Sequence, residues 1–103
     1  MTLNEIQHIA EISNTYDLDF PSQMDEWCEK VYSPVRKAIA NNDKTVIDYI
    51  SNYDTKDKYN LFTPVEDGAL DGQHPEAIAL CVKLCNELNV RVDDRLMLNK
   101  IAV

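Results

Sequence analysis

The sequence predicts an all-α protein built as an array of helix hairpins. Apolar residues recur at steps of three and four along most of the chain, and no stretch alternates apolar and polar residues over the length of a strand. Glycine and proline are scarce and do not cluster as they do in a flexible linker. With 103 residues, 45% of them hydrophobic, the chain suits one core, and we expect a single domain over residues 1–103.

Two helices are expected before residue 33. The first begins behind a capping box formed by Thr2 and Glu5 and carries an apolar residue at every third position. The residue before a proline is pushed out of helical geometry, so the segment that ends at Phe20 breaks this helix. Ser22 can cap the second helix. We expect Phe20 and Trp27 to lie in the core.

A short motif occurs twice in the second part of the chain. Ser33-Pro34-Val35 recurs as Thr63-Pro64-Val65, and the residues that follow align without a gap as far as Asn42 and Gly72. The hydroxyl residue can cap a helix, and proline suits the first helical position because its fixed φ is already helical. Asparagine and glycine take the left-handed conformation most easily. Each copy is therefore expected to begin a helix at the hydroxyl residue and to end it at Asn42 or Gly72.

A second helix is expected after each of these turns, because apolar residues again recur at helical spacing. Those of the first copy are Val46, Ile47, Tyr49 and Ile50, and those of the second are Ile78, Cys81, Val82, Cys85 and Leu88. A connector from Asn52 to Phe62 completes the first unit. A period of about 30 residues signals stacked supersecondary units.

The two units resemble ankyrin repeats, which share a Thr-Pro-Leu start, small apolar residues, a Gly-His turn and an apolar second helix. The second copy matches best, with Thr63-Pro64-Val65, Gly68-Ala69, Gly72, His74 and Glu76. Lys37 and Asp67 depart from the pattern, because the family has an apolar residue at that position; Arg36 and Glu66 replace its histidine.

The resemblance implies a short ankyrin-like stack with a capping segment at each end. Residues 1–32 are then the N-terminal capping helices, 33–62 the first repeat, 63–94 the second repeat and 95–103 the C-terminal cap. End units are needed because they cover the surface that a missing neighbour would bury.

Charge and cysteine content limit the classes of partner. The formal net charge of −8 repels a phosphate backbone and an anionic membrane, so we expect no direct nucleic-acid or membrane binding. An acidic surface favours rapid association with a basic protein. The N-terminal residues lack the features of a secretory signal, no apolar run reaches the length of a membrane span, and the cysteines number three. These features predict a cytoplasmic protein.

The residues that carry chemistry do not form a catalytic or metal-binding motif. His8 and His74 lie outside any nucleophile or base motif, and the resemblance gives His74 a structural role. Cys81 and Cys85 lack the further ligands that zinc requires, which favours buried thiols. No glycine-rich phosphate loop occurs. We therefore expect no enzyme activity, no cofactor and no metal.

Partner binding is expected on the loops between repeats and on the exposed side of the first helices, as the resemblance implies. Tyr53 and Tyr59 belong to a type that is common at binding hot spots, although they can equally pack under the loop. The predicted binding residues are Arg36, Lys37, Tyr53, Asp54, Asp57, Tyr59, Glu66, Asp67 and Asp71.

These features favour a protein-binding inhibitor, and most concretely an immunity protein that neutralises a basic, nuclease-type bacterial toxin. Two alternatives remain at this stage: a phage-type antagonist of a host defence complex, and a general ankyrin-like interaction adaptor. A small hydrolase is a third class, which would depend on His8 or His74. A nucleic-acid mimic predicts one dense acidic stripe, whereas an ankyrin-like binder predicts mixed charge with tyrosines at the rim. The oligomeric state is left open.

Overall fold

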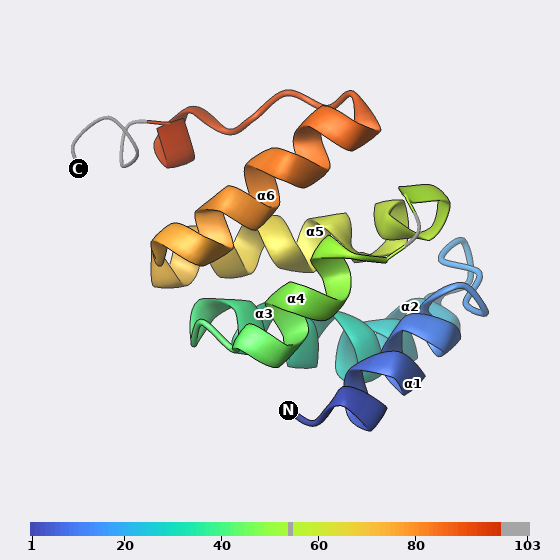
Figure 1. Ribbon diagram of the computed structural model, residues 1–103. Helices are drawn as coiled ribbons and strands as arrows, with labels where there is room; N and C mark the ends of the chain where they lie inside the picture. The colour runs from blue at the N-terminus through green and yellow to red at the C-terminus, as the bar shows by residue number, and fades with distance from the viewer. Residues whose placement is uncertain (54, 98–103) are drawn as a thin grey trace.

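The computed structural model confirms the all-α class (Figure 1). It describes residues 1–53 and 55–97, with the backbone alone for residues 55–59. The elements within these ranges are α1 (Leu3–Ser13), α2 (Pro21–Trp27), the π-helical turn η1 (Cys28–Tyr32), α3 (Ser33–Ala40), α4 (Lys44–Ser51), α5 (Thr55–Gly72) and α6 (Pro75–Leu88). The described residues contain no strand.

Two helix hairpins form the centre of the protein. One joins α3 to α4 and the other joins α5 to α6, and the two hairpins pack with α3 on α5 and α4 on α6. In Figure 1 the α5–α6 hairpin lies above the α3–α4 hairpin. α1 packs against α4 and η1 at the N-terminal side of the molecule.

α1 follows the prediction from local sequence. The Thr2 hydroxyl accepts the Glu5 amide at 3.2 Å, and the Glu5 carboxylate accepts the Thr2 amide at 3.1 Å. Both bonds satisfy amides that the first turn of a helix leaves without partners. Ile6, Ile9 and Ala10 are buried on the face that meets the core. The capping box therefore sets the start of this helix.

α2 differs from the prediction in its cap and in one supposed core residue. It begins at Pro21, and Phe20 occupies the N-cap position without a side-chain cap, so Ser22 is not the capping residue. Phe20 is 56% exposed, and its expected place in the core is wrong. The extended backbone that Pro21 imposes on Phe20 leaves this side chain on the outside of the corner between α1 and α2. Trp27 is partly buried against the core.

α3 begins at Ser33, as predicted, but Ser33 does not cap it, because the backbone before it is already helical. Tyr32 and Ser33 have right-handed helical backbone angles, and the Ser33 amide donates to the Cys28 carbonyl. α2, η1 and α3 therefore follow one another without a break in the helical backbone. Proline inside a helix removes one hydrogen bond and crowds the preceding turn. The wider π-helical turn directly before Pro34 loosens that crowding.

The second proline also lies inside a helix. α5 begins at Thr55 and passes through Pro64, so Thr63 is not an N-cap and the predicted connector is largely helical. Leu61 and Val65 are fully buried, one turn apart on the face that contains Pro64. Burial of this apolar face favours the continued helix over the break that proline propensity predicts.

The turns after α3 and α5 each contain one residue with a left-handed backbone conformation. Asn42 has a φ of 57°, as predicted, but in the second hairpin Gln73 takes this conformation with a φ of 56°, and Gly72 stays helical. A Cβ atom on Gly72 would lie 2.8 Å from the Ala40 carbonyl carbon. Gly72 is thus required for contact between helices, and its backbone freedom is not used.

The second helices of both hairpins bury most of the apolar residues that the sequence predicts, while Tyr49, Val82 and Leu88 are partly buried. Val46, Ile47 and Ile50 of α4 face the core. Cys81 and Cys85 of α6 are buried free thiols, and burial raises the pKa of both. Beyond α6, the described part of the predicted C-terminal cap buries Leu96, and residues 98–103 lie outside the described residues.

Candidate functional site

The structure places the predicted binding residues in separate locations. Arg36, Asp67 and Asp71 join in one cluster between α3 and α5, whereas Glu66 lines a pocket beside the segment after α6. Tyr53 lines a groove between α1 and α4. Lys37 is exposed on α3. The remaining predictions, Asp54 and the side chains of Asp57 and Tyr59, lie outside the described residues.

Tyr32, Arg36, Asp67 and Asp71 form what we call the α3–α5 clasp. Arg36 donates to both carboxylate oxygens of Asp71, with Nε–Oδ2 at 2.6 Å and Nη2–Oδ1 at 3.0 Å. Its third nitrogen donates to the Tyr32 hydroxyl at 2.7 Å, and that hydroxyl donates to Asp67. Tyr32, the last residue of η1, lies one turn before Arg36, and Asp67 lies one turn before Asp71, so α3 and α5 run side by side in the same direction.

In the clasp, Arg36 pairs with Asp71, whereas Asp67 accepts a hydrogen bond from the neutral Tyr32 hydroxyl. The hydrogen bond to Asp67 raises the pKa of the Tyr32 phenol, with burial adding to the effect. Arg36 lowers the pKa of the Asp71 carboxyl, chiefly through their hydrogen bonds. Asp67, which departs from the ankyrin pattern, therefore has a packing role between the helices. Tyr32, which lies one turn before Arg36, was not among the predicted binding residues.

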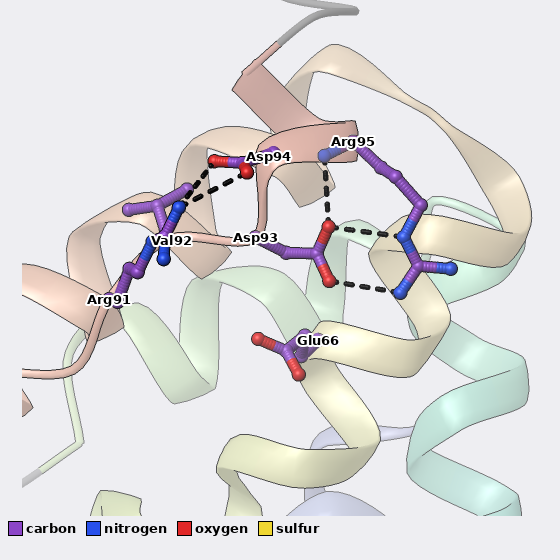
Figure 2. A pocket seen from close by; sticks show the side chains of 6 residues that line it. All are labelled: Glu66, Arg91, Val92, Asp93, Asp94 and Arg95. Carbon is purple, nitrogen blue, oxygen red and sulfur yellow. Dashed lines mark hydrogen bonds and ion pairs between the residues drawn. The ribbon is translucent and has the colours of Figure 1, made fainter.

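Glu66 lies in a shallow pocket closed by the segment that follows α6 (Figure 2). Arg95 donates to both oxygens of Asp93, at 3.1 and 2.9 Å, and Arg91 donates to both oxygens of Asp94, at 3.2 and 3.1 Å. Burial raises the pKa of the Glu66 carboxyl, and the negative charge of Asp93 raises it further. Both arginines are thus already paired with neighbouring carboxylates, so neither is free to bind an anionic ligand in this pocket.

A groove that we call the tyrosine groove lies between α1 and α4. Its lining residues are Leu3, Thr45, Asp48, Tyr49, Asn52 and Tyr53. The rings of Tyr49 and Tyr53 are 5.4 Å apart between centroids and inclined by 32°. Leu3 is 52% exposed at its edge. The predicted binding residues include Tyr53 but not Tyr49, which was predicted only as part of the apolar face of its helix and lines the same groove.

The corner between α1 and α2 exposes apolar side chains among carboxylates. Leu18, Phe20 and Met24 are 41, 56 and 38% exposed. The corner is held by local hydrogen bonds, since the Asp17 amide donates to Gln23 Oε1 at 2.7 Å and its carboxylate accepts the Asp19 amide at 3.1 Å. Of these three side chains, the sequence-based prediction had assigned Phe20 to the core.

Positive and negative groups are not balanced over the surface. Where the structure describes basic side chains, all except Lys37 form ion pairs with carboxylates: Lys30, Arg36, Lys44, Lys83, Arg91 and Arg95. A further set of carboxylates has no ion pair in the described part of the chain and lies within residues 1–53. We call these the unpaired acids: Glu5, Glu11, Asp17, Asp19, Asp25, Glu29 and Asp48. The uncompensated charge of this part of the surface is negative. Beyond residue 53, Glu66 and Asp67 also form no ion pair with a described residue.

No family model, curated protein or solved structure matches this chain. Over the described residues, no group of three or more histidine, cysteine or acidic side chains is placed to hold a metal ion. No helix in those ranges is both long and apolar enough to cross a membrane. The features that stand out lie on α1, α2 and α4, which carry unpaired acids together with exposed apolar and aromatic side chains.

Proposed function

We propose that this protein is a protein-binding inhibitor, and most concretely an immunity protein that neutralises a basic, nuclease-type bacterial toxin by direct binding. The observation that carries the proposal is the charge distribution. All described cations except Lys37 form internal ion pairs, whereas the unpaired acids of residues 1–53 have no cationic partner in the described part of the chain. Such a field attracts a basic partner and increases its association rate.

The same surface supports a protein partner over nucleic-acid mimicry. A mimic of nucleic acid needs a continuous row of negative charge. Here Glu26 is paired with Lys30 within the acidic region, and Phe20 and the tyrosine groove interrupt it with apolar area. Aromatic side chains surrounded by polar groups are common at protein interfaces. This mixed character favours the inhibitor over the phage-type antagonist.

The hairpin arrangement supports the ankyrin-like interpretation, which we retain as part of the proposal. α3 and α5 pack in the same direction, as the first helices of neighbouring repeats do, and α4 and α6 pack on each other. The continuous helices through Pro34 and Pro64 depart from the family pattern. Three free cysteines are consistent with the reducing cytoplasm in which an immunity protein acts.

The test is expression of each basic protein encoded next to the gene for this chain, with and without the chain. We expect growth arrest by the toxin alone and rescue by co-expression. With the purified pair, replacing Asp17, Asp19 and Asp25 together by asparagine should slow association by about tenfold at low salt, because these acids contribute to the attracting field. Glu76→Gln, at an acid already paired with Lys44, is the matched control with a small effect. Toxicity that co-expression does not change would refute the proposal.

A further inference from the structure

The tyrosine groove has the components of a receptor for one cationic side chain. Tyr49 lies on α4 and Tyr53 lies just beyond its end at Ser51, and their ring centroids are 5.4 Å apart, so they form one aromatic wall. The Leu3 side chain from α1 forms part of the lining, and Asn52 contributes an amide. Electron-rich aromatic faces attract cations, and tyrosine is among the side chains that do so well.

The charges around the groove point to the sign of its occupant. Asp48 lines it and has no ion pair in the part of the chain that the structure describes. Glu11 lies near enough to Tyr49 for its negative charge to raise the pKa of that phenol, after the larger effect of burial. Among the side chains that the structure describes, none in the lining of the groove is basic. A neutral or anionic occupant would therefore leave the negative charge of the groove uncompensated.

We infer that the tyrosine groove binds an arginine side chain of the basic partner, and this inference rests on the proposed function. A guanidinium group is planar, stacks on an aromatic face and can donate two hydrogen bonds to one carboxylate. Tyr49 and Tyr53 supply the face, and Asp48 supplies the carboxylate. An ammonium group satisfies the charge but not the planar stacking.

A second copy of this chain fits the groove less well than a separate basic partner. The arginines of the described residues are Arg36, Arg91 and Arg95, and each is held by a carboxylate of its own chain. Lys37 is the described cation without an ion pair, and it lacks the planar group that the aromatic wall favours. The occupant we assign is thus an arginine from another protein.

The inference is tested with short peptides, independently of any toxin. The probes are acetyl-Gly-Arg-Gly-amide, the lysine analogue, and the citrulline analogue, which keeps the shape of arginine without its charge. Ring signals of isotope-labelled tyrosine in the full chain report binding by NMR. We expect saturable shifts of Tyr49 and Tyr53 with the arginine peptide, weaker shifts with lysine and none with citrulline.

Variants locate the binding site. Asp48→Asn should weaken the arginine peptide at least threefold, and Glu11→Gln should weaken it less. Tyr49→Phe keeps the aromatic face and should retain binding, whereas Tyr49→Leu should abolish it. Asp25→Asn, at an unpaired acid on α2, is the matched control and should leave the titration unchanged.

Three outcomes overturn the inference: equal shifts with citrulline, no saturable shift with arginine, or equal weakening by Asp48→Asn and Asp25→Asn. Circular dichroism of each variant establishes that it is folded. If Tyr49→Leu does not fold, the comparison of Asp48→Asn with Asp25→Asn still decides the test. Binding of the toxin domain without binding of the arginine peptide would refute this inference and leave the proposed function intact. Peptide binding without toxin binding would refute the proposed function and leave the arginine site intact.

Discussion

A Cβ atom placed on Gly68 would lie 2.6 Å from the carbonyl oxygen of Arg36, so the backbones of α5 and α3 are in direct contact at this point. The same atom would lie 2.7 Å from the Cβ of Ile39, which is fully buried. Neither obstacle is a flexible side-chain end. The close approach of the two hairpins therefore depends on the absence of a side chain at residue 68.

Gly68→Ala should destabilise the protein by about 1–3 kcal/mol, because the added methyl group must push the helices apart. Helix propensity by itself predicts the opposite, a gain of about 0.8–1.0 kcal/mol. Urea unfolding measures which effect wins. Ala79→Gly, at an exposed position of α6, calibrates the propensity term with an expected loss of about 1 kcal/mol. A Gly68→Ala variant more stable than the natural chain would contradict the helix contact.

The Arg36–Asp71 pair should make stability depend on acid pH. Arg36 lowers the pKa of Asp71 in the folded state, so its contribution is present above the unfolded pKa and is lost as pH falls through the folded pKa. Asp71→Asn should thus be less stable than the natural chain at pH 7, with the difference vanishing in strong acid. High salt should also reduce the difference, because both side chains are about 40% exposed, at 41 and 42%. A deficit independent of pH would show that the charge is not its source.

Glu66→Gln should raise stability at pH 7, whereas Asp71→Asn should lower it. Burial and Asp93 raise the pKa of the Glu66 carboxyl, so its ionisation opposes folding as pH rises from the unfolded pKa through the folded pKa. The variant should gain up to about 0.5 kcal/mol at pH 7, since the site is partly solvated. Near pH 3 both chains carry a neutral group, and thermal melts should coincide. A loss of stability at pH 7 would indicate a favourable role for this carboxylate.

Phe20 should be dispensable for folding. Phe20→Ser should change the free energy of unfolding by less than about 0.5 kcal/mol, because the side chain is 56% exposed. Ile39→Ala, at a fully buried position, should cost about 2–5 kcal/mol. Chemical denaturation of both variants compares them directly. Equal losses would return Phe20 to the core, as the sequence had predicted.

The cysteines should differ in their reaction with an alkylating agent. Burial raises the pKa of Cys81, and the thiolate is the reacting species. Iodoacetamide at pH 8 should therefore modify the partly exposed Cys28 first and leave Cys81 unmodified until the protein unfolds. Mass spectrometry of digested samples gives the order. Early modification of Cys81 in the folded protein would contradict its burial.

Short-range signals in this sequence predicted structure well where one segment sufficed to satisfy them. The Thr2–Glu5 capping box needs only the first turn of α1, and it forms as predicted. The apolar spacing of α4 likewise placed Val46 and Ile50 on the buried face. For the candidate site, Tyr53 could be found as an aromatic residue near the rim, but its partner surface on α1 could not, because Leu3 is distant in sequence.

The sequence by itself determined the helical class, the positions of α1, α4 and α6, the acidic surplus and the buried cysteines. Local periodicity, charge and residue type contain this information. Only the tertiary structure decided that α5 continues through Pro64, that Gly72 serves contact with Ala40, and that Arg36 and Asp71 meet. The physical reason is that burial of Leu61 and Val65 against the rest of the core outweighs a local preference to break the helix at proline. Contacts between residues far apart in sequence have no local signature.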